Sequence, residues 1–135
     1  MERYTAKIMN VRVPPRKARL AAGLIRNKSV AAAKVQLIGS PMKSSGILIK
    51  LLKTAICNAL TQGAEREAFL TVQEVCVDSG RTLKRSKSRS RGSSTAVLKR
   101  SSHFSIVLSE SEALRTAYEE NRKAGKKEDT GRGSV

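Results

Sequence analysis

The chain has 135 residues, a net charge of +16 and an aromatic content of only 3%. That length supports one domain with a modest core and excludes two. The charge lies far outside the magnitude of about 2 to 8 that suffices for a small soluble domain, so the sequence indicates a polyanionic partner. No uncharged run approaches the roughly 20 apolar residues of a membrane span and no secretory signal is visible, so we expect a protein that has no membrane partner and is not exported.

The first half of the chain predicts one strand and then three helices. Residues 4–13 become rich in β-branched side chains toward their end and predict a strand, which a pair of prolines terminates. The first helix is expected over residues 16–27. Ser29 is placed to cap a second helix over residues 30–38, and the third and longest helix begins at a Ser-Pro pair and runs over residues 41–62.

The first and third helices each combine an apolar side with a basic one. Gly23 and Gly46 stand among the basic residues, where a glycine lowers helix propensity by up to about 1 kcal/mol. Two interpretations fit these glycines: the close approach of a sugar-phosphate backbone, or close contact with a neighbouring helix. The expected core positions are Leu20, Ala21, Leu24 and Ile25 in the first helix, and Leu48, Leu51, Leu52, Ala55, Ile56 and Ala59 in the third.

The second half predicts two strands that are joined by a long basic segment. Residues 69–78 and 99–108 have strand-like composition, and the nineteen residues from 80 to 98 far exceed an ordinary hairpin loop. One face of the later strand is expected to carry Ser102, Phe104, Ile106 and Leu108. Between Asp78 and Glu110 the chain has no acidic residue but eight basic ones, which are Arg81, Lys84, Arg85, Lys87, Arg89, Arg91, Lys99 and Arg100.

The middle of this basic segment, residues 86–94, contains no apolar side chain that a core could bury. Gly92 is its natural turning residue. Because so many like charges repel one another in water, we expect the segment to become ordered only against dense negative charge, of which a phosphate backbone is the commonest source.

The last part of the chain does not contribute to the charge. Residues 110–135 contain six acidic and six basic side chains, so residues 1–109 hold the whole excess of +16. We expect a helical start over residues 111–121 and a disordered tail after it.

No phosphate loop, catalytic triad or zinc pattern is present, so we expect no cofactor, no metal, no small-molecule substrate and no enzyme activity. Cys57 and Cys76 are interpreted as buried small apolar residues. Glu65 and Glu67 are interpreted as polar residues that face solvent, although an acid-base pair is the alternative. His103, the single histidine, fits either a phosphate contact or an ordinary position on a strand surface.

A set of motifs in a fixed order resembles the bacterial-type large-subunit ribosomal protein twenty-two family. The motifs are Pro15-Arg16-Lys17-Ala18-Arg19-Leu20, Leu24-Ile25-Arg26-Asn27-Lys28, Leu51-Leu52-Lys53-Thr54-Ala55-Ile56-Cys57-Asn58-Ala59, Val77-Asp78-Ser79-Gly80, Leu83-Lys84-Arg85 and Leu98-Lys99-Arg100-Ser101-Ser102-His103. The resemblance implies an α+β fold in which three helices pack on a three-stranded antiparallel sheet, with a long protruding basic β-hairpin. It implies a ribosomal RNA-binding domain over 1–109 that includes the hairpin 79–99, followed by a charged extension over 110–135.

The resemblance also implies a function and partners. The body is expected to bind large-subunit ribosomal RNA near the opening of the peptide exit tunnel, supporting subunit assembly, while the hairpin lines the tunnel wall. The implied partners are that RNA, neighbouring large-subunit ribosomal proteins and the nascent polypeptide. The implied location is the cytoplasmic ribosome, with an organellar ribosome as the alternative.

The expected RNA-binding residues come from the motifs and from the basic sides of the helices. They are Arg12, Arg16, Lys17, Arg19, Arg26, Lys43, Lys50, Lys53, Lys84, Arg85, Lys87, Arg89, Arg91, Gly92, Lys99, Arg100 and His103. The expected tunnel-lining tip is Lys87, Ser88, Arg89, Ser90, Arg91 and Gly92. At Ser88 the chain departs from the family, which often has proline there.

Three other functions are compatible with parts of the sequence. A free-standing architectural protein for double-stranded nucleic acid explains the charge but not the long hairpin. An Arg-Ser segment over residues 86–94 that phosphorylation switches is disfavoured by the short repeat. An enzyme would have only Glu65 and Glu67 as its catalytic groups.

Overall fold

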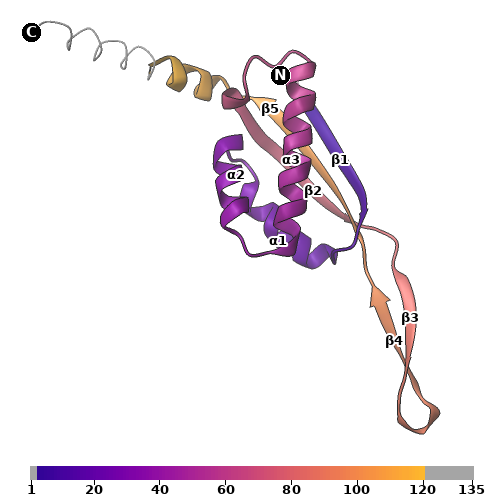
Figure 1. Ribbon diagram of the computed structural model, residues 1–135. Helices are drawn as coiled ribbons and strands as arrows, with labels where there is room; N and C mark the ends of the chain where they lie inside the picture. The colour runs from indigo at the N-terminus through magenta and orange to yellow at the C-terminus, as the bar shows by residue number, and fades with distance from the viewer. Residues whose placement is uncertain (1–2, 121–135) are drawn as a thin grey trace, which may run out of the picture.

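The computed structural model describes residues 3–120 and has the expected α+β architecture (Figure 1). Its elements are β1 (Arg3–Val11), α1 (Pro15–Ile25), α2 (Val30–Gly39), α3 (Lys43–Thr61), β2 (Leu70–Ser79), β3 (Leu83–Ser88), β4 (Ser94–Lys99) and β5 (Ser102–Glu110). Strands β1, β5 and β2 form an antiparallel sheet in that order, and β3 pairs with β4 in a separate hairpin. None of the helices in residues 3–120 is long and apolar enough to cross a membrane.

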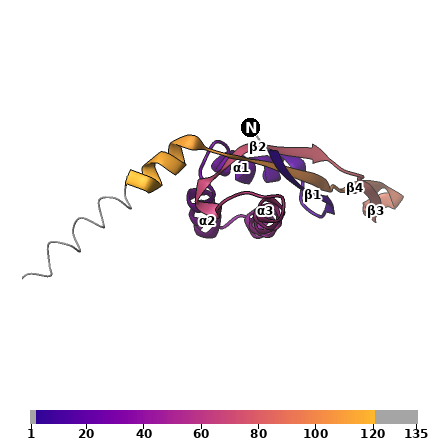
Figure 2. The ribbon, with the colours of Figure 1, turned by 90° about the horizontal axis from the view of Figure 1, so that it is seen from above.

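The three helices cover one face of the sheet, and the hairpin extends from one end of it (Figure 2). Residues 112–120 form a further helix at the opposite end. This confirms the helix that was expected to begin at residue 111. The disorder expected for the last residues concerns positions outside the part of the chain that the structure describes.

The core lies between the sheet and the helices, and the central strand β5 contributes to it by simple alternation. Ser102, Phe104, Ile106 and Leu108 are all buried, as expected for one face of a strand. From the helical side, Leu48, Leu52 and Ala55 of α3 are fully enclosed. The apolar stripe predicted for this helix is therefore confirmed.

The core face of α1 differs from the prediction. Leu20 was expected inside, but its side chain is 66% exposed, and Leu24 is only partly buried. The predictions for Ala21 and Ile25 are confirmed, and the other buried residues of the helix are Ala18 and Ala22. Because α1 packs against β2, its inner face is built of alanines, which allow close approach, and the larger leucine is turned toward solvent.

The β2 edge of the sheet is covered along part of its length, which blocks pairing with another strand there. At β2, Arg19 Nε donates a hydrogen bond to the Val77 carbonyl (3.2 Å), and Arg26 Nη2 donates one to the Val75 carbonyl (3.0 Å). Farther along the same edge, the Asn27 amide donates to the Val72 carbonyl (2.9 Å). Two of the predicted RNA-binding arginines thus also hold α1 to the sheet.

The strand predicted over residues 99–108 is divided in two. Lys99 ends β4, and β5 begins only at Ser102. Between them, the Ser101 hydroxyl donates to the Arg81 carbonyl (2.7 Å), and the Ser101 carbonyl accepts from the Gly80 amide (2.9 Å). These bonds replace a regular ladder, so the hairpin leaves the sheet at a defined joint.

Candidate nucleic-acid interface

The hairpin is a regular two-stranded ladder with a tight tip. Its pairs run from Leu83 opposite Lys99 to Ser88 opposite Ser94. The chain reverses through two residues with positive φ, which are Arg91 (56°) and Gly92 (72°). The prediction of Gly92 as a turning residue is confirmed, while the part played by Arg91 was missed because nothing in its side chain favours that conformation.

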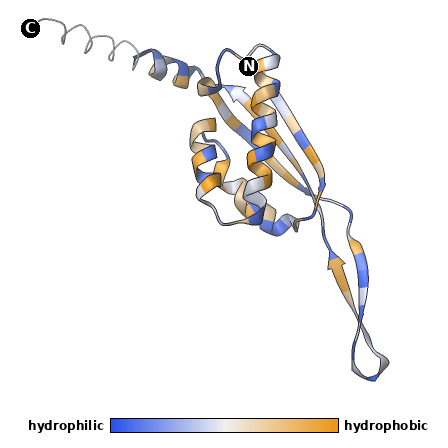
Figure 3. Ribbon diagram, in the orientation of Figure 1, coloured by the Kyte–Doolittle hydropathy of each residue, from blue (hydrophilic) through white to orange (hydrophobic). Residues whose placement is uncertain are grey.

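Serine hydroxyls and backbone groups close the tip. The Arg89 amide donates to the Ser93 carbonyl (2.8 Å), and the Ser93 hydroxyl donates to the Ser90 carbonyl (2.9 Å). The tip is therefore held by its own polar groups rather than by packing. This is consistent with Figure 3, where the tip lacks the apolar colouring that is seen among the helices and the sheet.

The hairpin cations are exposed and unneutralised. Lys84, Arg85, Lys87, Arg89 and Arg91 are all exposed, and the ion pairs found in residues 3–120 involve none of them. The hairpin cations thus lack acidic partners not only in the neighbouring sequence but also among the described residues of the folded chain. Of these five side chains, only that of Arg89 forms a hydrogen bond to another described residue, a weak one from Nε to the Thr95 hydroxyl (3.4 Å).

Three hollows lie at the end of the body from which the hairpin extends, and each is lined by basic side chains (Figure 1). The first, of about 520 Å³, lies between the end of β1 and the starts of α1 and α3, and is called the α3 cavity below. The second, of about 200 Å³, lies between β1 and the hairpin strands, and the third, of about 920 Å³, lies between α1 and the hairpin. Their basic lining residues, called the root face below, are Arg12, Arg16, Lys17, Arg19, Lys43, Arg81, Lys99 and Arg100.

The root face gathers many of the predicted RNA-binding residues from separate parts of the chain. It also includes Arg81, a basic residue that the sequence did not predict as an RNA-binding site, although it directly follows Gly80, where the hairpin begins. Lys50 and Lys53 are exposed farther along α3 and line none of these hollows. Arg26 lies at the far end of α1, against the edge of β2.

His103 has a definite partner at this joint. Its Nδ1 accepts a hydrogen bond from the Asn10 amide (3.0 Å), which leaves Nε2 to carry the proton of the neutral ring. A side chain at Gly80 would meet this ring, because a Cβ there would lie 3.1 Å from His103 Nε2 and 2.6 Å from Ser101 Oγ. His103 therefore helps to shape the hairpin root, whatever else it contacts.

The two surface glycines have open space around them. A Cβ added at Gly23 or Gly46 would meet no atom within 4 Å in the described structure. Close contact with another helix of residues 3–120 therefore does not explain these glycines. The approach of a sugar-phosphate backbone stays a prediction.

The cysteines do not both behave as expected. Cys57 is exposed, so its interpretation as a buried residue is wrong: on α3 it lies on the basic side, away from the core stripe. Cys76 is partly buried, and its thiol donates to Glu74 Oε1 (3.0 Å). That hydrogen bond, together with desolvation and the charges of Glu74 and Asp78, raises the pKa of the Cys76 thiol.

The glutamates of the segment between α3 and β2, residues 62–69, form ion pairs, and this segment is called the acidic linker below. Glu67 pairs with Lys34, and Glu65 pairs with Arg115 (2.6 Å). No cluster of three metal-binding side chains exists within residues 3–120. The two glutamates thus belong to the polar surface around the start of the C-terminal helix.

The fold and the root face together define a class: a small α+β protein with a basic hairpin and a surface suited to a polyanion. The family model for ribosomal protein L22p/L17e matches residues 6–109, and the chain belongs to that family. Among relatives named large ribosomal subunit protein uL22, that of Protochlamydia amoebophila is 50% identical over 99 residues, 73% of this chain and 89% of the relative. That of Chlamydia pneumoniae is 48% identical over 110 residues, 81% of this chain and 98% of the relative.

Proposed function

We propose that the chain binds large-subunit ribosomal RNA through its root face and hairpin, and that the hairpin lines the peptide exit tunnel and contacts the nascent polypeptide. As a member of the L22p/L17e family, the protein is a structural, non-enzymatic constituent of the large ribosomal subunit of the bacterial-type cytoplasmic ribosome. Its partners accordingly include ribosomal RNA and other ribosomal proteins.

One observation carries the proposal. The hairpin leaves the body with five exposed cations, no ion pair within residues 3–120 and almost no buried side chain, an arrangement that only a surrounding polyanion stabilises. The root face continues this charge onto the body, where it supports the docking of the domain. In this arrangement, phosphate contacts fix the position of the protein on the RNA, and the hairpin extends from the body into the tunnel.

The salt dependence of RNA binding tests the phosphate contacts. Substitution of Lys84, Arg85, Lys87, Arg89 and Arg91 by glutamine, singly and together, is expected to lower affinity for large-subunit RNA. Each lost phosphate contact should reduce the slope of log K against log salt by about 0.7 to 0.9. Lys7→Gln, an exposed cation of β1 outside the root face, is the matched control. An unaltered slope in the combined variant would remove these residues as phosphate ligands.

Sedimentation of native lysate separates ribosomal assembly from free-standing nucleic-acid binding. The protein is expected to co-migrate with large subunits at moderate salt. A free pool bound to duplex fragments would instead favour the architectural alternative.

A placement test addresses the tunnel. A photo-crosslinker that replaces Ser90, at the hairpin tip, is expected to capture a stalled nascent chain, whereas the same crosslinker at Val35 of α2 is not. Capture at neither position would contradict the tunnel contact.

A further inference from the structure

The α3 cavity has features that phosphate contacts along an RNA helix do not require. Besides its three cations, it is lined by Val13, Pro14, Leu20, Met42 and Ser44. Its volume of about 520 Å³ falls within the range of roughly 300 to 1,000 Å³ that is typical of small-molecule sites. A surface that only tracks phosphates needs charge but not an apolar hollow.

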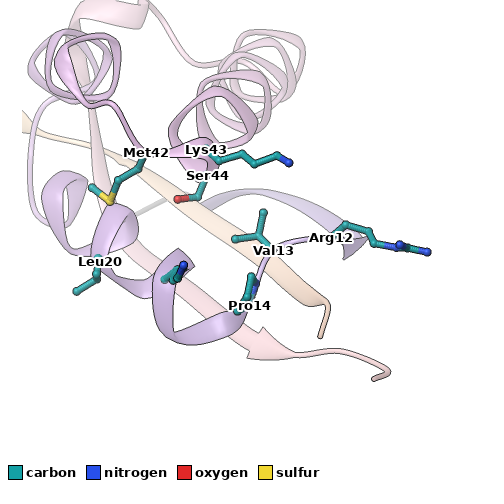
Figure 4. A pocket seen from close by; sticks show the side chains of 8 residues that line it. Arg12, Val13, Pro14, Leu20, Met42, Lys43 and Ser44 are labelled. Carbon is teal, nitrogen blue, oxygen red and sulfur yellow. The ribbon is translucent and has the colours of Figure 1, made fainter. Parts of the chain in front are cut away.

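The lining is divided between an apolar end and a charged end (Figure 4). Leu20 and Met42 lie at one side, and the charged ends of Arg12 and Lys43 extend to the other. Leu20 leaves two thirds of its side chain exposed beside this hollow. The division suits a ligand that has a flat apolar part and an anionic part.

The start of α3 lies at this cavity and has no cap of its own. Met42 occupies the N-cap position without a side-chain hydrogen bond, and the first turn contains no acidic residue. The amides of Lys43 and Ser44 precede the first intrahelical bonds, so they are free to donate, and the helix dipole adds positive potential there. Such an end attracts an anion such as phosphate.

Ser44 independently points to a ligand. The residue is only 3% exposed, and Figure 4 shows its hydroxyl oxygen directed into the cavity. Within residues 3–120 that hydroxyl has no hydrogen-bond partner. Unlike the hydroxyls of Ser40 and Ser45, which are the buried unpaired ones among the described residues, that of Ser44 can be reached from the cavity. A polar group of a bound ligand can therefore take the place of water as its hydrogen-bond partner.

We propose that the α3 cavity binds one unstacked nucleotide of the large-subunit RNA. Its base lies on Leu20 and Met42, its phosphate lies at the first turn of α3 near Lys43, and the Ser44 hydroxyl bonds to the ligand. Loops and bulges of folded RNA present such unpaired bases. The inference rests on the proposed function, because the cavity shares Arg12 and Lys17 with the hollows of the root face and so continues that surface.

Chemical probing of the RNA at single-nucleotide resolution tests the inference with the full chain. Leu20→Trp fills the apolar end from an exposed position and leaves the core intact. It is expected to weaken binding about tenfold and to restore reactivity at one base that the wild-type protein protects. Ser44→Val should weaken binding severalfold without changing the salt slope, because the hydroxyl carries no charge. Val35→Trp, on the 71% exposed Val35 of α2, should match the wild type.

The outcomes separate this inference from the proposed function. If the wild-type protein binds the RNA and Leu20→Trp gives the same footprint, the nucleotide site is overturned, whereas the proposed RNA binding stands. Absence of wild-type RNA binding overturns the proposed function itself. A photo-crosslinker at position 20 in assembled subunits gives the remaining test: capture of RNA supports a nucleotide in the cavity, whereas capture of a ribosomal protein overturns it.

Discussion

At the scale of the residue, two glycines of this chain have opposite relations to their surroundings. Gly80 is enclosed by Ser101 and His103, whereas Gly23 faces open space in the last turn of α1. Gly80→Ala should therefore cost about 1–3 kcal/mol of stability, since Ser101 must abandon its bond to the Arg81 carbonyl. Gly23→Ala should instead stabilise by about 0.5–1 kcal/mol through helix propensity.

Urea unfolding of the two variants measures both effects. The same Gly23→Ala protein also tests backbone approach, because an added methyl group should weaken RNA binding while raising stability. Equal stability of Gly80→Ala and the wild type would show that the hairpin joint is loose.

The Cys76 thiol provides a second prediction at this scale. Because its hydrogen bond to Glu74 and the neighbouring carboxylates raise the thiol pKa, less reactive thiolate is present at a given pH near 8. In a Cys57→Ser background, alkylation of Cys76 should rise with pH later than that of a free cysteine peptide. Glu74→Gln should move the profile to lower pH, and an unchanged profile would contradict the role of Glu74.

Whether a side chain is buried could be predicted from the sequence where the strand or helix periodicity alone determines it. It could not be predicted where the size of the side chain determines it. The alternation of β5 placed Phe104 and Ile106 correctly. The helical period of α1 placed Ala21 and Ile25 correctly but also placed Leu20 in the core. Hydrophobicity alone does not reveal that the face of α1 against β2 is built mainly of alanines. The unpaired Ser44 at the α3 cavity gave no sequence signal at all.

At the scale of the element, the hairpin differs from the sheet that carries it. Every residue of β3 except Leu83 is exposed, and a two-stranded hairpin without a covered face is marginally stable in water. In the free protein, the amides of β3 and β4 should exchange hydrogen close to intrinsic rates while those of β5 are strongly protected. Addition of large-subunit RNA should slow exchange in the hairpin. Protection of β3 equal to that of β5 without RNA would contradict this.

The three helices and the three strands of the sheet followed from the sequence, whereas the joint between hairpin and sheet did not. Proline, glycine and serine marked the ends of the helices through local chemistry. The division between β4 and β5 depends on Ser101 bonding across the chain to Arg81, a contact between residues twenty positions apart. The composition around Lys99 and Arg100 is that of a continuous strand, so the sequence did not predict the break between β4 and β5.

At the scale of the whole molecule, the region that carries the excess positive charge differs from the C-terminal region, which contributes packing contacts. Residues 1–109, which include the region matched by the family model, carry the excess charge. The C-terminal helix, by contrast, attaches to the acidic linker through aromatic and ionic contacts. The Tyr118 ring meets Phe69 edge to face at 5.6 Å, and Arg115 pairs with Glu65. The aromatic contact is worth about 0.5–1.5 kcal/mol, and the exposed ion pair adds at most about 1 kcal/mol.

A chain that ends at Ser111 tests this separation. It loses five acidic and six basic residues, so its net charge changes by one, and every cation of the root face is retained. Unfolding should therefore show a loss of about 1–2 kcal/mol, whereas the salt slope of RNA binding should match that of the full chain. A slope lower by several units would mean that the extension itself contacts phosphate, since a purely structural segment lowers stability without releasing counterions.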